Sequence, residues 1–131
     1  MNEQRSLFEE TDIVYAYSRA QAIADGVLMD VSDMAREAGI NFPVALTMGL
    51  WNGYIVPAEE SLLHCQCVKG RLWDTLWLFR CAVKGFSGDT LFFDVAYAVT
   101  GRRVSTVKLK AVCGPGDTAA PVITIMLPDE D

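Results

Sequence analysis

The spacing of apolar residues in the middle of the chain predicts one long helix. Leu72, Leu76 and Phe79 recur every three or four residues, and Val83 continues the series. This spacing lines one side of an α-helix with apolar side chains. We therefore predict an amphipathic helix over residues 72–84.

Beyond residue 90 the apolar positions change to a period of two, which is typical of a strand with one buried face. Apolar residues occupy every second position over 91–99 and 106–113, and most residues between them are polar or small, Phe92 and Val112 excepted. A third apolar run covers 122–127. Turns are predicted at 100–103 and at the Gly-Pro-Gly-Asp segment 114–117. Because short connections join consecutive strands, we predict a three-stranded antiparallel meander.

The segment before the long helix has the start and stop signals of several short helices. Ser18 and Gln21 have the spacing of a capping box, and Gly26 ends the helix that they begin. An extended piece follows at 27–31, and a second short helix covers 33–38.

Proline marks two further helix starts in this segment. Pro43 can occupy the first position of a third helix, which would carry Val44 and Leu46. Pro57 begins a fourth, which would end near Lys69-Gly70.

These elements predict an α+β fold in a single domain. Short N-terminal helices and one long amphipathic helix would pack on the C-terminal three-stranded antiparallel meander. We expect residues 1–16 to form a polar arm and 17–131 to form the domain. The meander's wet face is marked by Asp94, Lys108 and Lys110.

Composition narrows the class of protein. The chain has 131 residues, of which 51% are hydrophobic and 21% are charged, as in a globular domain. The N-terminus has no pattern of a signal peptide, and no apolar run is long enough to span a membrane. With four cysteines, the sequence therefore favours a cytoplasmic protein with reduced thiols.

Charge is unevenly distributed along the chain. Residues 1–68 carry ten acids and three bases, whereas 69–131 carry seven acids and eight bases. Two binding surfaces follow from this asymmetry. One is an acidic surface for a basic protein partner, and the other is a basic strip for an anion. The acidic surface comprises Glu9, Glu10, Asp12, Glu59 and Glu60, and the basic strip comprises Arg102, Arg103, Lys108 and Lys110. The overall net charge of −6 argues against general affinity for nucleic acid.

The segment His64-Cys65-Gln66-Cys67 contains the chain's only histidine and is the strongest candidate for metal or nucleophilic chemistry. A structural zinc ion needs four ligands in a tetrahedron. As a helix the segment would place His64 and Cys67 on one face and Cys65 on another, and as a strand it would separate His64 from both thiols. We therefore expect no metal, no cofactor and no catalytic residue here, and we expect the thiols to be packing groups.

Other candidates also have a structural interpretation. Cys113 stands in line with core-facing residues of its strand, so we expect it in the core. Trp73 and Trp77 are spaced as helix neighbours, and we expect them in the core as well.

Four segments together resemble an uncharacterised family (a domain of unknown function). They are YSRAQAIADGVLMDVS (17–32), PVALT (43–47), GRLWDTLW (70–77) and VCGPGDTAAPVITIMLP (112–128). The members of this family are small proteins encoded on bacterial conjugative plasmids and integrative mobile elements. The resemblance implies a bacterial mobile-element gene and implies no catalytic residue.

Three functions follow from these observations. The leading expectation is a non-enzymatic protein-binding module of a mobile element that occupies a host or element protein, such as a defence complex in the manner of anti-restriction or anti-CRISPR proteins. The alternatives are a small nucleic-acid-processing enzyme, resembling a ribonuclease toxin, that uses the C-terminal sheet, and a structural or regulatory homodimer. No membrane partner is expected.

Overall fold

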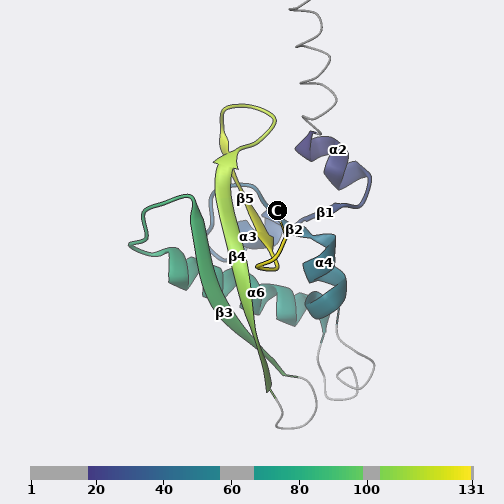
Figure 1. Ribbon diagram of the computed structural model, residues 1–131, viewed down its shortest axis with the longest axis vertical. Coiled ribbons are helices and arrows are strands. Elements are labelled where there is room, and N and C mark those ends of the chain that lie inside the picture. Colours follow the sequence, from purple (N-terminus) through teal and green to yellow (C-terminus); the bar gives the residue numbers. More distant parts are fainter. Residues whose placement is uncertain (1–17, 57–66, 99–103, 131) are drawn as a thin grey trace, which may run out of the picture.

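The computed structural model describes residues 18–56, 67–98 and 104–130. Its centre is a five-stranded mixed sheet in the order β1-β2-β5-β4-β3, crossed by the long helix α6 (Figure 1). Strands β2 and β5 are parallel, and every other neighbouring pair is antiparallel. The strands are β1 (Leu28–Asp30), β2 (Val44–Thr47), β3 (Thr90–Ala98), β4 (Val104–Pro115) and β5 (Pro121–Met126). The helices are α2 (Arg19–Ala24), α3 (Ser32–Glu37), α4 (Met48–Leu50), the π-helical turn η1 (Trp51–Ile55) and α6 (Val68–Val83).

The predicted three-stranded meander is wrong as a description of the sheet. Strands β3, β4 and β5 do form consecutive antiparallel pairs. However, β5 is also paired with β2 on its other side, and β2 with β1, so the sheet is mixed and wider than predicted. The α+β class is confirmed, but two strands of the sheet come from the N-terminal segment that was predicted to contain helices and a short extended piece.

The helix predicted to start at Pro43 is a central strand instead. The Pro43 carbonyl accepts a hydrogen bond from the Ile123 N–H at 2.9 Å, so the proline begins β2 beside β5. Val44, Ala45 and Leu46 are all fully buried, so both faces of this strand are covered. Apolar and polar residues therefore do not alternate along it. A short apolar run of this kind is compatible with a buried strand and with a helix. Proline is also permitted at the first residue of a strand.

The other short N-terminal elements agree with the sequence. The Ser18 hydroxyl accepts a hydrogen bond from the Gln21 N–H at 3.0 Å and caps α2. Gly26 and Gly39 adopt positive φ values of 78° and 93° directly after α2 and α3. The predicted extended piece is β1, which pairs with β2 at the far edge of the sheet.

Helix α2 is joined to the distant loop between β4 and β5. The Asp117 carboxylate accepts hydrogen bonds from the backbone N–H groups of Arg19 and Ala20, at 2.6 and 3.0 Å. These bonds hold the pKa of Asp117 below its ordinary value. The Arg19 guanidinium donates to the Thr124 hydroxyl at 2.7 Å and also to the Ile123 carbonyl. Helix α2 is therefore attached to strand β5 and to the loop that precedes it.

The turn predicted at 114–117 lies later in the chain. Strand β4 continues to Pro115, which pairs with Pro121, and the Gly116 N–H donates to the Ala120 carbonyl at 3.1 Å. The chain therefore reverses over 117–120. The nitrogen of Pro115 faces away from β5, so its missing N–H costs this strand pair no hydrogen bond.

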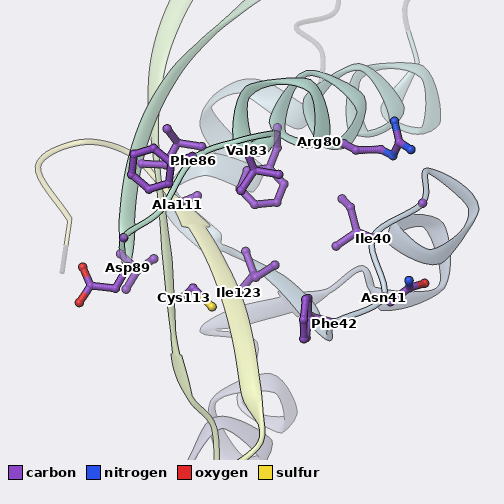
Figure 2. Close-up of a pocket in the computed structure, with 15 residues that line it drawn as sticks. Ile40, Asn41, Phe42, Arg80, Val83, Phe86, Asp89, Ala111, Cys113 and Ile123 are labelled. Atoms are coloured by element: carbon purple, nitrogen blue, oxygen red, sulfur yellow. The ribbon is translucent and has the colours of Figure 1, made fainter.

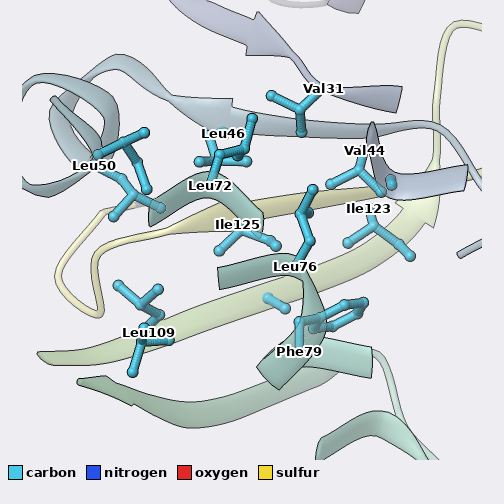
Figure 3. Packing of buried hydrophobic residues seen from close by; sticks show 14 of the residues in the cluster. Val31, Val44, Leu46, Leu50, Leu72, Leu76, Phe79, Leu109, Ile123 and Ile125 are labelled. Atoms are coloured by element: carbon cyan, nitrogen blue, oxygen red, sulfur yellow. The ribbon is translucent and has the colours of Figure 1, made fainter. Parts of the chain in front are cut away.

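Helix α6 covers one face of the sheet and forms the core with it (Figure 3). Leu72, Leu76 and Phe79 are buried and point toward β2, β4 and β5. The helix begins earlier than predicted, because Cys67 caps it by accepting a hydrogen bond from the Gly70 N–H at 3.2 Å. Gly70 therefore lies inside the helix rather than ending one. Of the helix predicted from Pro57 to near Lys69-Gly70, residues 57–66 lie outside the described residues.

Candidate functional site

A cleft of about 270 Å³ opens between the C-terminal half of α6, the loop between α3 and β2, and the sheet (Figure 2). Polar atoms make up a small part of its wall. The apolar residues that line it include Ile40, Phe42, Phe79, Val83, Phe86 and Ile123. Phe42 and Phe86 stand at its rim with exposed fractions of 47% and 42%. The cleft is therefore an apolar recess bordered by exposed aromatic rings.

Gly39 allows the loop on one side of the cleft to approach α6 closely. A Cβ atom at this position would lie 2.5 Å from Nε of Arg80, so the Arg80 side chain would have to move away. Gly39 also has φ of 93°, which favours glycine. Because glycine permits both the close approach to Arg80 and the positive φ, the loop after Gly39 can hold Ile40 and Phe42 opposite the end of α6 (Figure 2).

The solvent-facing side of α6 carries a row of aromatic and cationic groups that leads to this cleft. The rings of Trp73 and Trp77 stack with centroids 6.1 Å apart and planes inclined by 13°. The guanidinium carbon of Arg80 lies 5.3 Å from the centroid of the Trp77 ring, within the range of a cation–π interaction. We call Trp73, Trp77 and Arg80 the aromatic row.

The prediction that both tryptophans lie in the core is wrong. Trp73 is 37% exposed and Trp77 is 42% exposed. The core side of α6 is filled by Leu72, Leu76 and Phe79, which leaves the tryptophans beside it no room in the interior. Arg80 links the two parts of the candidate site, because it belongs to the row and its side chain also borders the cleft.

A buried polar group joins α6 to the sheet and to η1. The hydroxyls of Thr75 and Tyr97 are hydrogen-bonded at 2.6 Å, and Thr75 also donates to the Arg71 carbonyl. The Arg71 guanidinium lies over the Tyr97 ring and donates to the Tyr54 carbonyl at 2.7 Å. Burial raises the pKa of Tyr97 to about 12, although the hydrogen bond between the Tyr97 and Thr75 hydroxyls lowers it in part. Tyr97 is therefore neutral at physiological pH. The contacts among Arg71, Thr75, Tyr97 and the Tyr54 carbonyl connect α6 to β3 and to η1.

The described part of the predicted basic strip is engaged within the chain. Nζ of Lys108 lies 3.7 Å from a carboxylate oxygen of Asp94 on the neighbouring strand. The Lys110 ammonium donates to the backbone carbonyl of Glu130. Asp94 and Lys108 lie on the wet face, as predicted. Arg102 and Arg103 lie outside the described residues, so the strip as a whole stays a prediction.

The predicted acidic surface also stays a prediction. All of its members lie outside the described residues, and so do His64 and Cys65. The members are Glu9, Glu10, Asp12, Glu59 and Glu60.

The described thiols occupy three separate places. Cys67 caps α6, and Cys81 and Cys113 are exposed. Cys113 does share a strand face with Leu109 and Ala111, as predicted, but it lies near the end of β4 and borders the cleft instead of entering the core. Within 18–56, 67–98 and 104–130, no group of three acidic, histidine or cysteine residues is arranged to hold a metal ion.

Sequence reasoning missed the residues that form the cleft rim. Phe42 in Asn-Phe-Pro and Phe86 in Gly-Phe-Ser-Gly are large aromatic residues within loop signals. Aromatic rings in loops, outside any helix or strand period, are the signal that could have indicated an exposed recess.

The fold and the site define an α+β protein with an apolar cleft beside an exposed aromatic row. Its whole length, residues 1–131, matches the family model described as a family of unknown function (DUF6573), and the chain belongs to that family. The resemblance to an uncharacterised family is therefore confirmed, whereas the mobile-element origin stays a prediction. Neither the comparison with curated proteins nor the comparison with solved structures finds a match. Among the described helices, none is long and apolar enough to cross a membrane.

Proposed function

We propose that this chain is a non-enzymatic protein-binding module that contacts its partner through the aromatic row and the adjacent cleft. The observation that carries the proposal is that Trp73 and Trp77 are exposed to solvent, while other side chains of the same helix form its contact with the core. Tryptophan and arginine are enriched among the residues that contribute most to protein interfaces. The aromatic row consists of these two residue types.

The cleft supplies the second element of such an interface. An apolar cavity of about 150 Å³ is large enough to bind benzene. The cleft, at about 270 Å³, therefore has room for one large aromatic or branched side chain of a partner. Insertion of that side chain would cover the exposed rings of Phe42 and Phe86 and remove apolar surface from water.

The row and the cleft would act together because Arg80 lies between them. Its guanidinium is held over the Trp77 ring, and its side chain borders the cleft. A partner that packs on the tryptophans and fills the cleft would enclose Arg80 and could accept its hydrogen bonds. An acceptor on the partner beside its apolar anchor would make this recognition specific.

The biological setting that we propose is a bacterial mobile element whose product occupies a host or element protein, including a defence complex. The resemblance of the sequence to small mobile-element proteins supports this setting. The negative charge of residues 1–68 supports a basic partner, because opposite charges raise the rate of association.

A capture experiment with matched variants tests the proposal. The wild-type chain would be compared with a Trp73→Ala/Trp77→Ala double variant and with Val104→Ala, which truncates a residue that is 60% exposed on β4. We expect the wild type and Val104→Ala to retain the same stoichiometric protein from a bacterial lysate. The double variant should lose at least about tenfold in affinity.

Thermal unfolding of all three proteins controls for stability. If no stoichiometric partner is captured by the wild type, the function is wrong. If a partner binds the double variant as tightly as the wild type, the function stands but the surface is wrong.

A further inference from the structure

Strand β3 forms one edge of the sheet and is the longer of its two edge strands. It has nine residues, against three in β1 at the opposite edge. Its register with β4 runs from Thr90↔Val112 to Ala98↔Val104 without a bulge. Among the described residues, no strand lies on its other side (Figure 1).

The register shows which backbone groups of β3 are available at this edge. The Cys113 N–H donates to the Asp89 carbonyl at 2.8 Å, beside the pair Thr90↔Val112. In an antiparallel pair the hydrogen-bonding direction alternates at each residue. The backbone groups of the odd-numbered residues of β3 are therefore hydrogen-bonded to β4. The N–H and C=O groups of Phe92, Asp94 and Ala96 point away from β4, in the plane of the sheet.

The β3 edge lacks the features that normally protect an edge strand. Proteins discourage edge-to-edge pairing with prolines, bulges, lysines or very short strands. Strand β3 contains no proline and no lysine, and the ring of Phe92 is 50% exposed. Its one charged residue, Asp94, lies 3.7 Å from Lys108, which offsets the charge.

We propose that β3 pairs with β3 of a second copy of this chain, antiparallel and about a two-fold axis, so that two sheets become one. A two-fold axis brings the same patch of each copy together. The excess of acids that gives the net charge of −6 lies in residues 1–68, so two copies that meet through that half of the chain repel each other. At β3 the local charge cancels, and this edge is where two copies can approach without that cost.

The charge of Asp94 also limits the register of this pairing. A register that places the two Asp94 side chains directly opposite each other is disfavoured, because like charges at such positions repel. An axis beside Phe92 or Val95 avoids this contact. With the axis beside Phe92, the two exposed Phe92 rings cover each other.

The dimer is independent of the proposed partner surface, because its residues belong to the sheet edge and not to the aromatic row. Amide hydrogen exchange of the purified chain, followed by NMR at increasing protein concentration, tests it residue by residue. We expect Leu91, Phe93 and Val95 to be protected at every concentration. The amides of Phe92, Asp94 and Ala96 should become protected only as the concentration rises. If these three amides stay unprotected at the highest concentration, the pairing is wrong.

Variants at the edge provide the second test, with molar mass from light scattering as the measurement. Phe92→Lys introduces an edge lysine. Ala96→Pro removes an N–H that points away from β4, so it leaves the chain's own sheet intact. We expect each to raise the dimer dissociation constant at least about tenfold.

Phe42→Lys is the matched control, because it places the same charge on an exposed ring at the cleft, away from the edge, and should stay dimeric. A wild-type monomer at all concentrations overturns the proposal, and so does a dimer that neither edge variant weakens. If the edge served a strand of a different protein, the pure chain would be monomeric, which is the first of these outcomes.

Discussion

The two sides of helix α6 both carry large apolar residues but have opposite surroundings. Leu72 and Leu76 on one side are buried against the sheet, whereas Trp73 and Trp77 on the other stack on each other in contact with solvent. The buried side stabilises the fold, because it removes apolar area from water. The exposed side forgoes that gain and keeps its apolar area available for a partner. Substitutions on the two sides should therefore separate stability from binding.

The largest effect on stability is expected for Leu76→Ala. Leu76 is fully buried in the core cluster, and its truncation leaves a cavity between α6 and the sheet. We expect the free energy of unfolding to fall by about 2–5 kcal/mol. Urea denaturation measures the change. The matched control is Leu78→Ala, the same truncation at a residue that is 37% exposed, which should cost less than about 1 kcal/mol. Equal losses at both positions would contradict the comparison.

The next effect is expected at the polar contact within the buried side. Thr75→Val leaves the Tyr97 hydroxyl without its partner at 2.6 Å, and we expect a loss of about 1–3 kcal/mol. Thr75→Val combined with Tyr97→Phe removes both groups and should cost less than the sum of the single substitutions. A double-mutant cycle from urea denaturation measures this coupling. Strict additivity would show that the two hydroxyls do not stabilise each other.

A smaller change in stability is expected for Trp77→Ala on the exposed side. The substitution removes one stacking contact and one cation–π contact, both at the surface. We expect it to lower the free energy of unfolding by about 1 kcal/mol or less. Its effect on partner affinity should be larger than its effect on stability. Titration calorimetry with the captured partner, alongside denaturation, gives both numbers for one protein. A loss of stability as large as that of Leu76→Ala would place Trp77 functionally in the core.

The smallest effect is expected for Asp74→Asn, also on the exposed side. Partial burial raises the pKa of the Asp74 carboxyl above its ordinary value. The folded protein therefore binds this proton more tightly than the unfolded chain, and ionisation of Asp74 lowers stability as the pH rises through the folded pKa. Asp74→Asn should be slightly more stable than the wild type at neutral pH, and the difference should vanish in acid below both pKa values. Melting temperatures across this pH range measure it. A less stable variant at neutral pH would contradict the sign.

Sequence reasoning worked where one local period decides the structure. Helix α6 and strand β3 each show a clear period of apolar positions. Strand β3 (Thr90–Ala98) lies within one residue of the predicted 91–99, whereas α6 (Val68–Val83) ends one residue before the predicted end and begins four residues before the predicted start. The Ser18 cap and the glycines at the ends of α2 and α3 were likewise predicted, because they satisfy backbone groups or φ values within a few residues.

Strand β2 shows why the rest of the fold could not be predicted. Its residues are buried on both faces by segments distant in the sequence, which removes the alternation that identifies a strand. Its neighbour β5 lies about eighty residues further along the chain, and no local pattern reports such a pairing. The same limit applies to the candidate site, because the cleft combines Phe42, Phe86 and Cys113 from three separate segments.

By itself, the sequence determined the α+β class, the long amphipathic helix, the three C-terminal strands and the membership of an uncharacterised family, because each depends on local period or on a match of residues. Only the tertiary structure decided that β2 joins β5, that Trp73 and Trp77 remain outside the core, and that β3 lies at an edge of the described sheet. These three outcomes share one physical reason. Each depends on which distant segments cover a given face, and coverage of a face is a property of the packed chain.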